Sequence, residues 1–294
     1  MGSATLLEGS ATTDYTSLLL RYFAAEGLLH GHHVHICAMP ASWAKELPAV
    51  SSTRAQAKPS LNENLRIAWR YKSLGEHKGD IGGSRATGQT ATNNDGPFCH
   101  MYDLTKRLTI SETSKLSFVQ IEDGLDPFRN MILELEKILQ SSPSSTVHRV
   151  VLPNFLSPTC YPYSCSNPRT ALVFLQRLNL LRQKFASRLV VCLSLSENLY
   201  SRNSSLGRWI ELYCDNVFQL IPFANESRSE TTSAQGLFKV HKLFTVPERG
   251  THFVIQHLQD LAFKASRKSF LIEPWTLPPL GNDEKDEIVK NVEF

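Results

Sequence analysis

The sequence predicts an α/β fold in which a mostly parallel sheet is flanked by helices. Apolar runs of strand length alternate with segments of helical periodicity along most of the 294 residues. Residues 189–193 are apolar throughout, which is typical of a strand that a parallel sheet buries on both faces. A hydrophobic fraction of 41% and a charged fraction of 20% are ordinary for a globular chain, and they exclude fibrous and wholly disordered classes.

Residues 1–50 are expected to form the first strand–helix units of the main domain. Short apolar runs predict two strands, and apolar residues at helical spacing predict a helix after each. In chain order these elements are a strand at 5–7, a helix at 18–27, a strand at 33–39 and a short helix at 42–47 that Pro48 ends.

Residues 51–118 lack a clear periodicity and are expected to be an insertion. Within it, residues 79–97 consist largely of Gly, Ser, Thr, Asn and Asp, with Ile81 as the only large aliphatic residue. Such a composition buries too little apolar surface to fold, so this part is predicted to be disordered.

Residues 119–281 are expected to complete the domain, and the polar, acidic tail 282–294 to be flexible. Asp126 and Pro127 are residue types that cap and begin helices, ahead of a periodic apolar segment. The expected elements are helices at 128–139, 172–185 and 206–214 and strands at 147–152, 189–193, 216–223, 236–246 and 268–273.

Composition also limits chemistry and location. The six cysteines are scattered without a CxxC pair, so neither a disulfide framework nor structural zinc is expected. No apolar run reaches the ~20 residues of a membrane-spanning helix, and the first residues lack the layout of a signal peptide. Cytoplasmic and nuclear locations are therefore expected, with no membrane partner.

Four histidines, His30, His32, His33 and His35, lie close together, and imidazole is a common ligand of transition metals. In a strand His33 and His35 share a face, while the other two fall in the preceding turn. This spacing does not assemble a tetrahedral site, so no metal site is expected.

Residues 9–16 occupy the place of a phosphate-binding loop, between the first strand and the first helix. In the pattern G-x-x-x-x-G-K-[ST], glycines let backbone N–H groups wrap the phosphates and the lysine neutralises them. Gly9 and Thr16 match, but Asp14 and Tyr15 stand where the second glycine and the lysine belong. The strand at 147–152 is followed by Asn154 and not by a magnesium-binding carboxylate.

Two interpretations of this loop follow. It is either a plain strand-to-helix turn with a capping side chain, or the degenerate phosphate-binding loop of a RecA-like ATPase scaffold that has lost its catalytic groups. The missing carboxylate and the order of elements favour the second.

Basic residues are concentrated between residues 168 and 210. This stretch has seven basic residues and one acid, hence a charge of +6, whereas the whole chain carries +3. Such an excess would attract a phosphate backbone. Arg202 and Arg208, which flank a loop after a buried strand, are the first candidates, followed by Arg169. The alternative is that most of these side chains form the solvated face of a helix.

Several strings along the chain resemble the PAXNEB family of Elongator subunits. The most specific are residues 65–71, Leu-Arg-Ile-Ala-Trp-Arg-Tyr, and residues 236–243, Gly-Leu-Phe-Lys-Val-His-Lys-Leu. Further similar strings are at residues 23–28, 44–48, 102–108, 151–158 and 268–275. The family has a segment ahead of the first strand that this chain is expected to lack.

The resemblance implies a RecA-like subunit without a working phosphate-loop lysine, which forms a hetero-hexameric ring with the fifth and sixth Elongator subunits. That ring is accessory to the rest of Elongator, which modifies the wobble uridine (U34) of tRNA towards 5-carboxymethyl derivatives. We therefore expect a non-catalytic chain that has no cofactor of its own and binds tRNA, with Arg202, Arg208 and Arg169 as candidate contacts and ATP restricted to subunit interfaces of the ring.

Two alternatives stay open. The chain could belong to a ring ATPase whose nucleotide site a neighbouring subunit completes, although Asp14, Tyr15 and Asn154 count against this. It could instead be a pure assembly module whose basic surface meets an acidic protein and no RNA.

Overall fold

The computed structural model describes residues 2–10, 12–51, 99–109, 112–223, 234–244 and 261–275. Contacts divide the chain into two units, Ser51–Met101 and the combined segments Met1–Val50 and Tyr102–Phe294. The sheet and the helices belong to the second of these, which is called the main unit below. The segment predicted to be disordered, 79–97, and the tail 282–294 lie outside the described residues.

The main unit contains a sheet that has nine strands within the described residues. Its parallel part runs in the spatial order β8 (Asn216–Pro222), β1 (Ala4–Gly9), β7 (Leu189–Ser196), β6 (His148–Leu152), β2 (His33–Cys37) and β5 (Leu116–Val119). The strand that precedes the phosphate-loop segment is therefore central. The predicted α/β class with a mostly parallel sheet is confirmed.

Beyond β8 the sheet continues as an antiparallel meander. Its strands are β9 (Gly236–Lys242), β10 (Leu261–Ala265) and β11 (Phe270–Pro274). A separate antiparallel pair is formed by β3 (Pro48–Val50) and β4 (Tyr102–Arg107).

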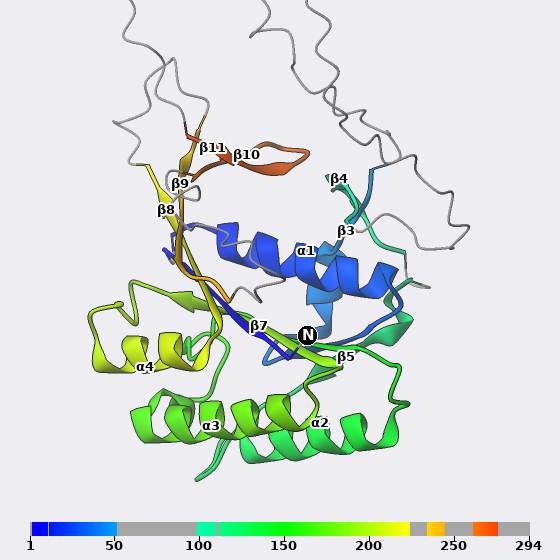
Figure 1. Ribbon diagram of the computed structural model, residues 1–294, viewed down its shortest axis with the longest axis vertical. Helices are drawn as coiled ribbons and strands as arrows, with labels where there is room; N and C mark the ends of the chain where they lie inside the picture. The colour runs from blue at the N-terminus through cyan, green and yellow to red at the C-terminus, as the bar shows by residue number, and fades with distance from the viewer. Residues whose placement is uncertain are drawn as a thin grey trace, which may run out of the picture. The chain divides into compact units, whose positions relative to one another are not determined.

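Helices cover both faces of the sheet. Helix α1 (Tyr15–Leu29) lies on one face, and α2 (Arg129–Ser141), α3 (Pro168–Lys184) and α4 (Ser205–Tyr213) lie on the other (Figure 1). Short 3-10 helices η1 (Ala41–Glu46), η4 (Glu112–Lys115) and η5 (Tyr163–Ser166) join the larger elements. Among the described residues no helix is long and apolar enough to cross a membrane.

The alternation of side chains along the strands builds a separate core on each face. In β1, Leu6 belongs to the core beneath α2, α3 and α4, whereas the next residue, Leu7, belongs to the core beneath α1. The first core includes a stacked pair, Phe128 and Phe174, with ring centroids 4.2 Å apart. Strand β7 is buried along almost its whole length, as its uninterrupted apolar sequence predicts.

The predicted insertion 51–118 is too long. Residues 102–119 lie in the main unit, where they supply β4 and the edge strand β5. Strand β5 has four residues and pairs in parallel with β2, from Val34 with Leu116 to Cys37 with Val119. So short a strand gives too few alternations to be recognised in a polar context.

Two predicted boundaries also differ. The expected strand at 33–39 ends at Cys37, because Ala38 takes a left-handed conformation with φ 59°. Asp126 does not cap α2, which begins at Arg129 without a side-chain cap. The carboxylate of Asp126 instead accepts a hydrogen bond from Arg177 Nη1 at 2.5 Å.

Candidate functional site

The loop between β1 and α1 opens into a cavity at the carboxyl edge of the sheet, the edge at which the parallel strands end. The cavity has a volume of about 450 Å³. Its wall consists mainly of hydroxyl side chains from the loop after β1, from the loop after β6 and from the end of β7. Gly9, Asp14 and Thr16 line it, as does Asn154, whereas Tyr15 does not. The structure thus brings the loop and Asn154 together at one cavity, whereas the side chain of Tyr15 points elsewhere.

Tyr15, at the position of the missing lysine, packs against the antiparallel meander. Its ring meets that of Phe263 edge-on, with centroids 4.7 Å apart, and lies 6.1 Å from that of Phe270. Its hydroxyl donates a hydrogen bond to Gln235 Oε1 at 3.2 Å. The side chain therefore holds the start of α1 to β10 and β11.

Gly9 and Thr16, the two residues that match the phosphate-loop pattern, contact each other. A Cβ atom at Gly9 would lie 2.6 Å from Cγ2 of Thr16, which is closer than van der Waals contact allows. The glycine is thus required for the packing of the first turn of α1 against β1, independently of any phosphate.

The carboxylate of Asp14 forms an ion pair with Arg21 of α1. Arg21 Nη1 lies 2.8 Å from Asp14 Oδ2, and the other amino group of Arg21 contacts Glu46. Because the Asp14 side chain is mostly exposed, this pair contributes little to stability.

The backbone after β6 is strained at the cavity. Asn154 and Leu156 both have positive φ angles, 46° and 61°. Ser194 of β7 holds this turn, since its hydroxyl and its carbonyl oxygen accept hydrogen bonds from the backbone N–H groups of Asn154 and Phe155, respectively, at 2.8 and 2.7 Å.

Among the described residues, this cavity offers no cation for the phosphates of a nucleoside triphosphate. None of the described residues that line the cavity is a lysine or arginine, and Asp14 would repel phosphate. Tyr15, which stands at the lysine position, packs its ring against Phe263.

Most basic side chains between residues 168 and 210 have partners within the chain. Five of its seven basic side chains bind carboxylates or carbonyl oxygens. These contacts are Arg177 with Asp126, Arg182 with Asp215, Lys184 with Glu136, Arg188 with the carbonyl oxygens of Leu139, Ser142 and Pro143, and Arg202 with Glu211.

Arg202 is the centre of a charge cluster between β1, α4 and β9. Its guanidinium binds Glu211 through two hydrogen bonds of 2.8 and 3.0 Å, and its Nε lies 3.1 Å from Oε2 of Glu8. Glu8 is 1% exposed, and burial, together with the Glu211 charge, raises its pKa to about 7. His241, on β9, contacts the same guanidinium, and its Nε2 lies 2.7 Å from Gln219 Oε1. The guanidinium predicted to contact tRNA is therefore engaged within the chain.

Arg169 and Arg208 differ from the other five. Both side chains are exposed, and neither guanidinium has a partner among the described residues. Arg169 lies in the first turn of α3 and Arg208 in the first turn of α4. Because these helices follow β6 and β7, both arginines lie at the carboxyl edge of the sheet.

Two exposed aromatic residues close in sequence to these arginines escaped the sequence analysis. Tyr163, in η5, is 89% exposed, and Trp209, next to Arg208, is 48% exposed. A helical projection of α4 could have revealed Trp209, since Leu206 and Ile210 define the buried face.

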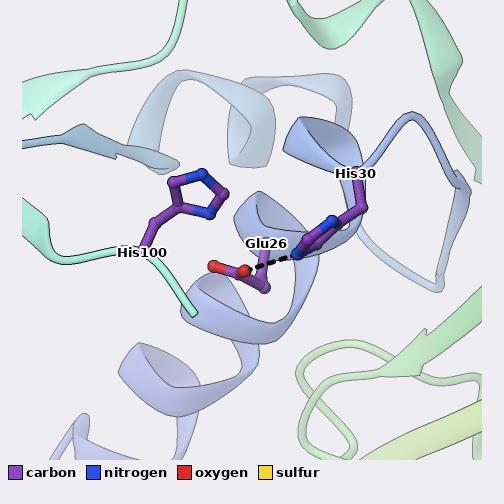
Figure 2. A group of neighbouring side chains, drawn as sticks. All are labelled: Glu26, His30 and His100. Carbon is purple, nitrogen blue, oxygen red and sulfur yellow. Dashed lines mark hydrogen bonds and ion pairs between the residues drawn. The ribbon is translucent and has the colours of Figure 1, made fainter. Parts of the chain in front are cut away.

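The clustered histidines have separate structural roles. His30 Nε2 lies 2.8 Å from Oε1 of Glu26, one turn earlier in α1 (Figure 2). His100, also drawn there, belongs to the unit Ser51–Met101. His32 Nδ1 accepts a hydrogen bond from Arg149 Nε at 3.1 Å. His33 packs against His148 with ring centroids 5.3 Å apart.

His35 and His148 form the buried part of this group. His35 Nε2 lies 3.0 Å from His148 Nδ1, and the outer nitrogens contact the hydroxyls of Ser117 and Ser142 at 2.6 and 2.8 Å. Burial lowers the pKa of His35 to about 3 and that of His148 to about 4, so both are neutral at pH 7.

Comparison with known proteins identifies the family. The family model described as PAXNEB protein matches residues 1–292. The chain belongs to the PAXNEB family. Among curated relatives of this PAXNEB chain, the Schizosaccharomyces pombe protein is 31% identical over 95% of the chain and 80% of its own length. The Homo sapiens protein is 25% identical over 95% and 73%. Both are named Elongator complex protein 4.

A solved structure is also similar to this PAXNEB chain. The ATPase domain of G40P matches with a TM-score of 0.48 and 12% identity, over 83% of the chain and 78% of that structure.

Proposed function

We propose that this chain is an accessory subunit of Elongator that binds tRNA at the carboxyl edge of its sheet. Family membership supports the Elongator assignment, since the curated relatives are named Elongator complex protein 4. The proposed assembly is a hetero-hexameric ring with the fifth and sixth subunits, and the proposed process is 5-carboxymethyl-type modification of U34.

The proposal that the chain is non-catalytic rests on the cavity at residues 9–16. It has hydroxyl groups where an ATPase needs a lysine, and Asn154 in place of a magnesium-binding acid. The chain's contribution to the complex would thus be binding and not chemistry.

The proposed tRNA binding rests on two arginines whose guanidinium groups have no partner among the described residues. Arg169 and Arg208 lie at one edge of the sheet, and each is close in sequence to an exposed aromatic residue, Tyr163 and Trp209, respectively. Guanidinium groups bind phosphate, and exposed rings stack on unpaired bases, so the two together favour single-stranded regions of RNA. Arg, Tyr and Trp also dominate protein–protein contacts, so a protein partner is the alternative that the test has to separate from RNA.

The test is the double substitution Arg169→Glu/Arg208→Glu. We expect tRNA affinity to fall about 10- to 100-fold at fixed salt, and the slope of log affinity against log salt to become shallower by roughly 2, since two phosphate contacts are lost. Filter binding over a salt series measures both. The matched control, Lys137→Glu/Lys264→Glu, changes the net charge equally at exposed sites away from that edge, on α2 and β10.

Assembly is checked in the same samples by native mass spectrometry after co-expression with the fifth and sixth subunits. The proposal expects a six-chain species for wild type and for both variants. Equal tRNA affinity of the wild type and the Arg169→Glu/Arg208→Glu variant within an intact ring would refute the RNA role of this edge.

A further inference from the structure

A second cavity, of about 490 Å³, lies at the start of α3. Its lining comes from two places, the loop after β5 with Gly124 and Leu125, and the segment that contains η5 and the first residues of α3. The volume is within the range of ligand pockets, about 300–1,000 Å³. None of its lining residues carries a charge.

The walls of this cavity include two apolar side chains that the fold leaves in solvent. Tyr163 is 89% exposed, and Leu125 is fully exposed. Both side chains are therefore accessible to a ligand that enters the cavity. Tyr163 offers a flat ring for stacking, which is the contact that unpaired bases make with proteins.

The remaining lining residues supply hydrogen-bonding groups. Asn167 uses its Oδ1 to accept from the backbone N–H of Arg169 at 2.9 Å, which leaves its amide N–H₂ group as a donor. Ser166 and Thr170 add hydroxyl groups that both donate and accept. These are the groups that read the edge of a base.

One cation, Arg169, stands in the sequence between the lining residues Pro168 and Thr170. The Arg169 guanidinium has no partner among the described residues, and the first turn of α3 contains no acid. Asp126 is paired with Arg177. Asp123 accepts hydrogen bonds from Ser164 and from the N–H of Gly124 at the loop, and its negative charge opposes the attraction of Arg169.

We infer that this cavity binds a single unpaired nucleotide of RNA, with its base stacked on Tyr163 and its phosphate at Arg169. A neutral, hydrogen-bonding pocket with an aromatic wall and a cation beside it matches a base and its phosphate. The inference rests on the proposed tRNA binding and deepens it, because it specifies an unpaired base as the ligand and not the backbone of a helix.

The test uses the full chain and a short RNA hairpin whose loop carries one 2-aminopurine, a base analogue whose fluorescence falls on stacking. The variants are Tyr163→Ala, which removes the ring, and Tyr163→Phe, which keeps it. Phe244→Ala is the matched control, since Phe244 is also an exposed aromatic residue, beyond the end of β9. A hairpin with a fully paired 2-aminopurine controls for binding without an unpaired base.

We expect the wild type, Tyr163→Phe and Phe244→Ala to quench the loop base and to bind equally. Tyr163→Ala should lose the quenching and bind about tenfold more weakly, the effect of one base stacked on an aromatic ring. The paired base should not be quenched by any variant.

Three results would overturn the inference. Quenching by Tyr163→Ala would show that the base stacks elsewhere, and equal losses in Tyr163→Ala and Tyr163→Phe would show that the hydroxyl acts and not the ring. Unchanged RNA binding by Tyr163→Ala with loss of assembly with the fifth and sixth subunits would make the cavity a protein contact. Failure of the wild type to bind either hairpin or tRNA would instead contradict the proposed function itself.

Discussion

At the scale of single residues, Tyr15 joins the start of α1 to the antiparallel meander. Its ring joins Phe263 and Phe270, and its hydroxyl reaches Gln235, so the side chain contributes to stability where a lysine would contribute to phosphate binding. A lysine at this position would gain a charge but lose this packing, because the neighbouring strands are packed against an aromatic ring.

This packing predicts the result of restoring the lysine. Tyr15→Lys should destabilise the chain by about 2–3 kcal/mol, because a half-buried aromatic ring is lost. It should not create ATP binding, since Asp14 and the missing acid at position 154 are unchanged. Urea unfolding and binding of a fluorescent ATP analogue measure the two effects.

Tyr15→Phe is the control for that substitution. It keeps the ring and loses the hydrogen bond to Gln235, so a cost below about 1 kcal/mol is expected. A Tyr15→Lys variant as stable as the wild type and able to bind the analogue would show that the loop had kept its phosphate-binding geometry.

At the scale of elements, Arg202 connects two strands of the sheet with helix α4. It lies in the loop ahead of α4 and binds Glu211 of α4, Glu8 of β1 and His241 of β9. Removing the cation would leave the buried Glu8 beside the charge of Glu211 without its positive partner, so Glu8 would have to take up a proton. A variant at Arg202 thus tests folding before it tests RNA.

We expect Arg202→Ala to lower the free energy of unfolding by about 2–3 kcal/mol, somewhat less than the loss of one partner from a fully buried pair. Adding Glu8→Gln should restore part of this loss, because the amide carries no charge. Arg208→Ala, at the exposed arginine of α4, should change stability by less than about 0.5 kcal/mol. Equal stabilities of Arg202→Ala and Arg208→Ala in urea unfolding would contradict the structural role of Arg202.

The elements that could be predicted from sequence are those with enough length to show a period. Helix α3 and strand β7 are examples, since each repeats its pattern over several turns or alternations. Strand β5 has four residues in a polar context and could not be recognised, and β10 was not predicted either, although β2 and β6 have the same length as β10 and were. Their place in the sheet depends on pairing with distant strands, which no local pattern records.

The candidate site shows the same limit. The loop at residues 9–16 could be located because Gly9, Thr16 and the order of elements are local features. The choice between Arg202 and Arg169 could not be made from sequence, because the carboxylates that engage Arg202 come from β1 and α4. Charge counted along the chain does not show which cations are already paired.

At the scale of the whole molecule, stability is linked to pH through His35 and His148, which join β2 and β6 inside the core. In the unfolded chain both imidazoles titrate near about 6.5, whereas burial holds their pKa values in the fold at about 3 and about 4. Between these values the unfolded chain binds protons that the native chain does not. Stability contributed by the neutral pair is therefore complete above about pH 6.5 and falls as the pH is lowered towards 4.

Each histidine should contribute a loss of about 1.4 kcal/mol per pH unit across this window. Glu8 acts in the opposite sense, because its raised pKa lets the native chain bind a proton first. Comparison of wild type with His35→Gln isolates one histidine: the pH dependence of the unfolding free energy between pH 7 and 5 should decrease by about one proton. The same slope in both proteins would show that the fold does not lower the pKa of His35.

The packing of Tyr15 also has an evolutionary consequence. A lineage with this side chain between β10 and β11 loses stability at the first step towards lysine, before any phosphate contact is gained, because Asp14 and Asn154 would have to change as well. Each single substitution towards the phosphate-loop pattern is thus expected to cost stability or to gain nothing by itself. Related chains that branch after the tyrosine is in place are expected to vary the rest of the loop freely while they keep an aromatic residue at this position.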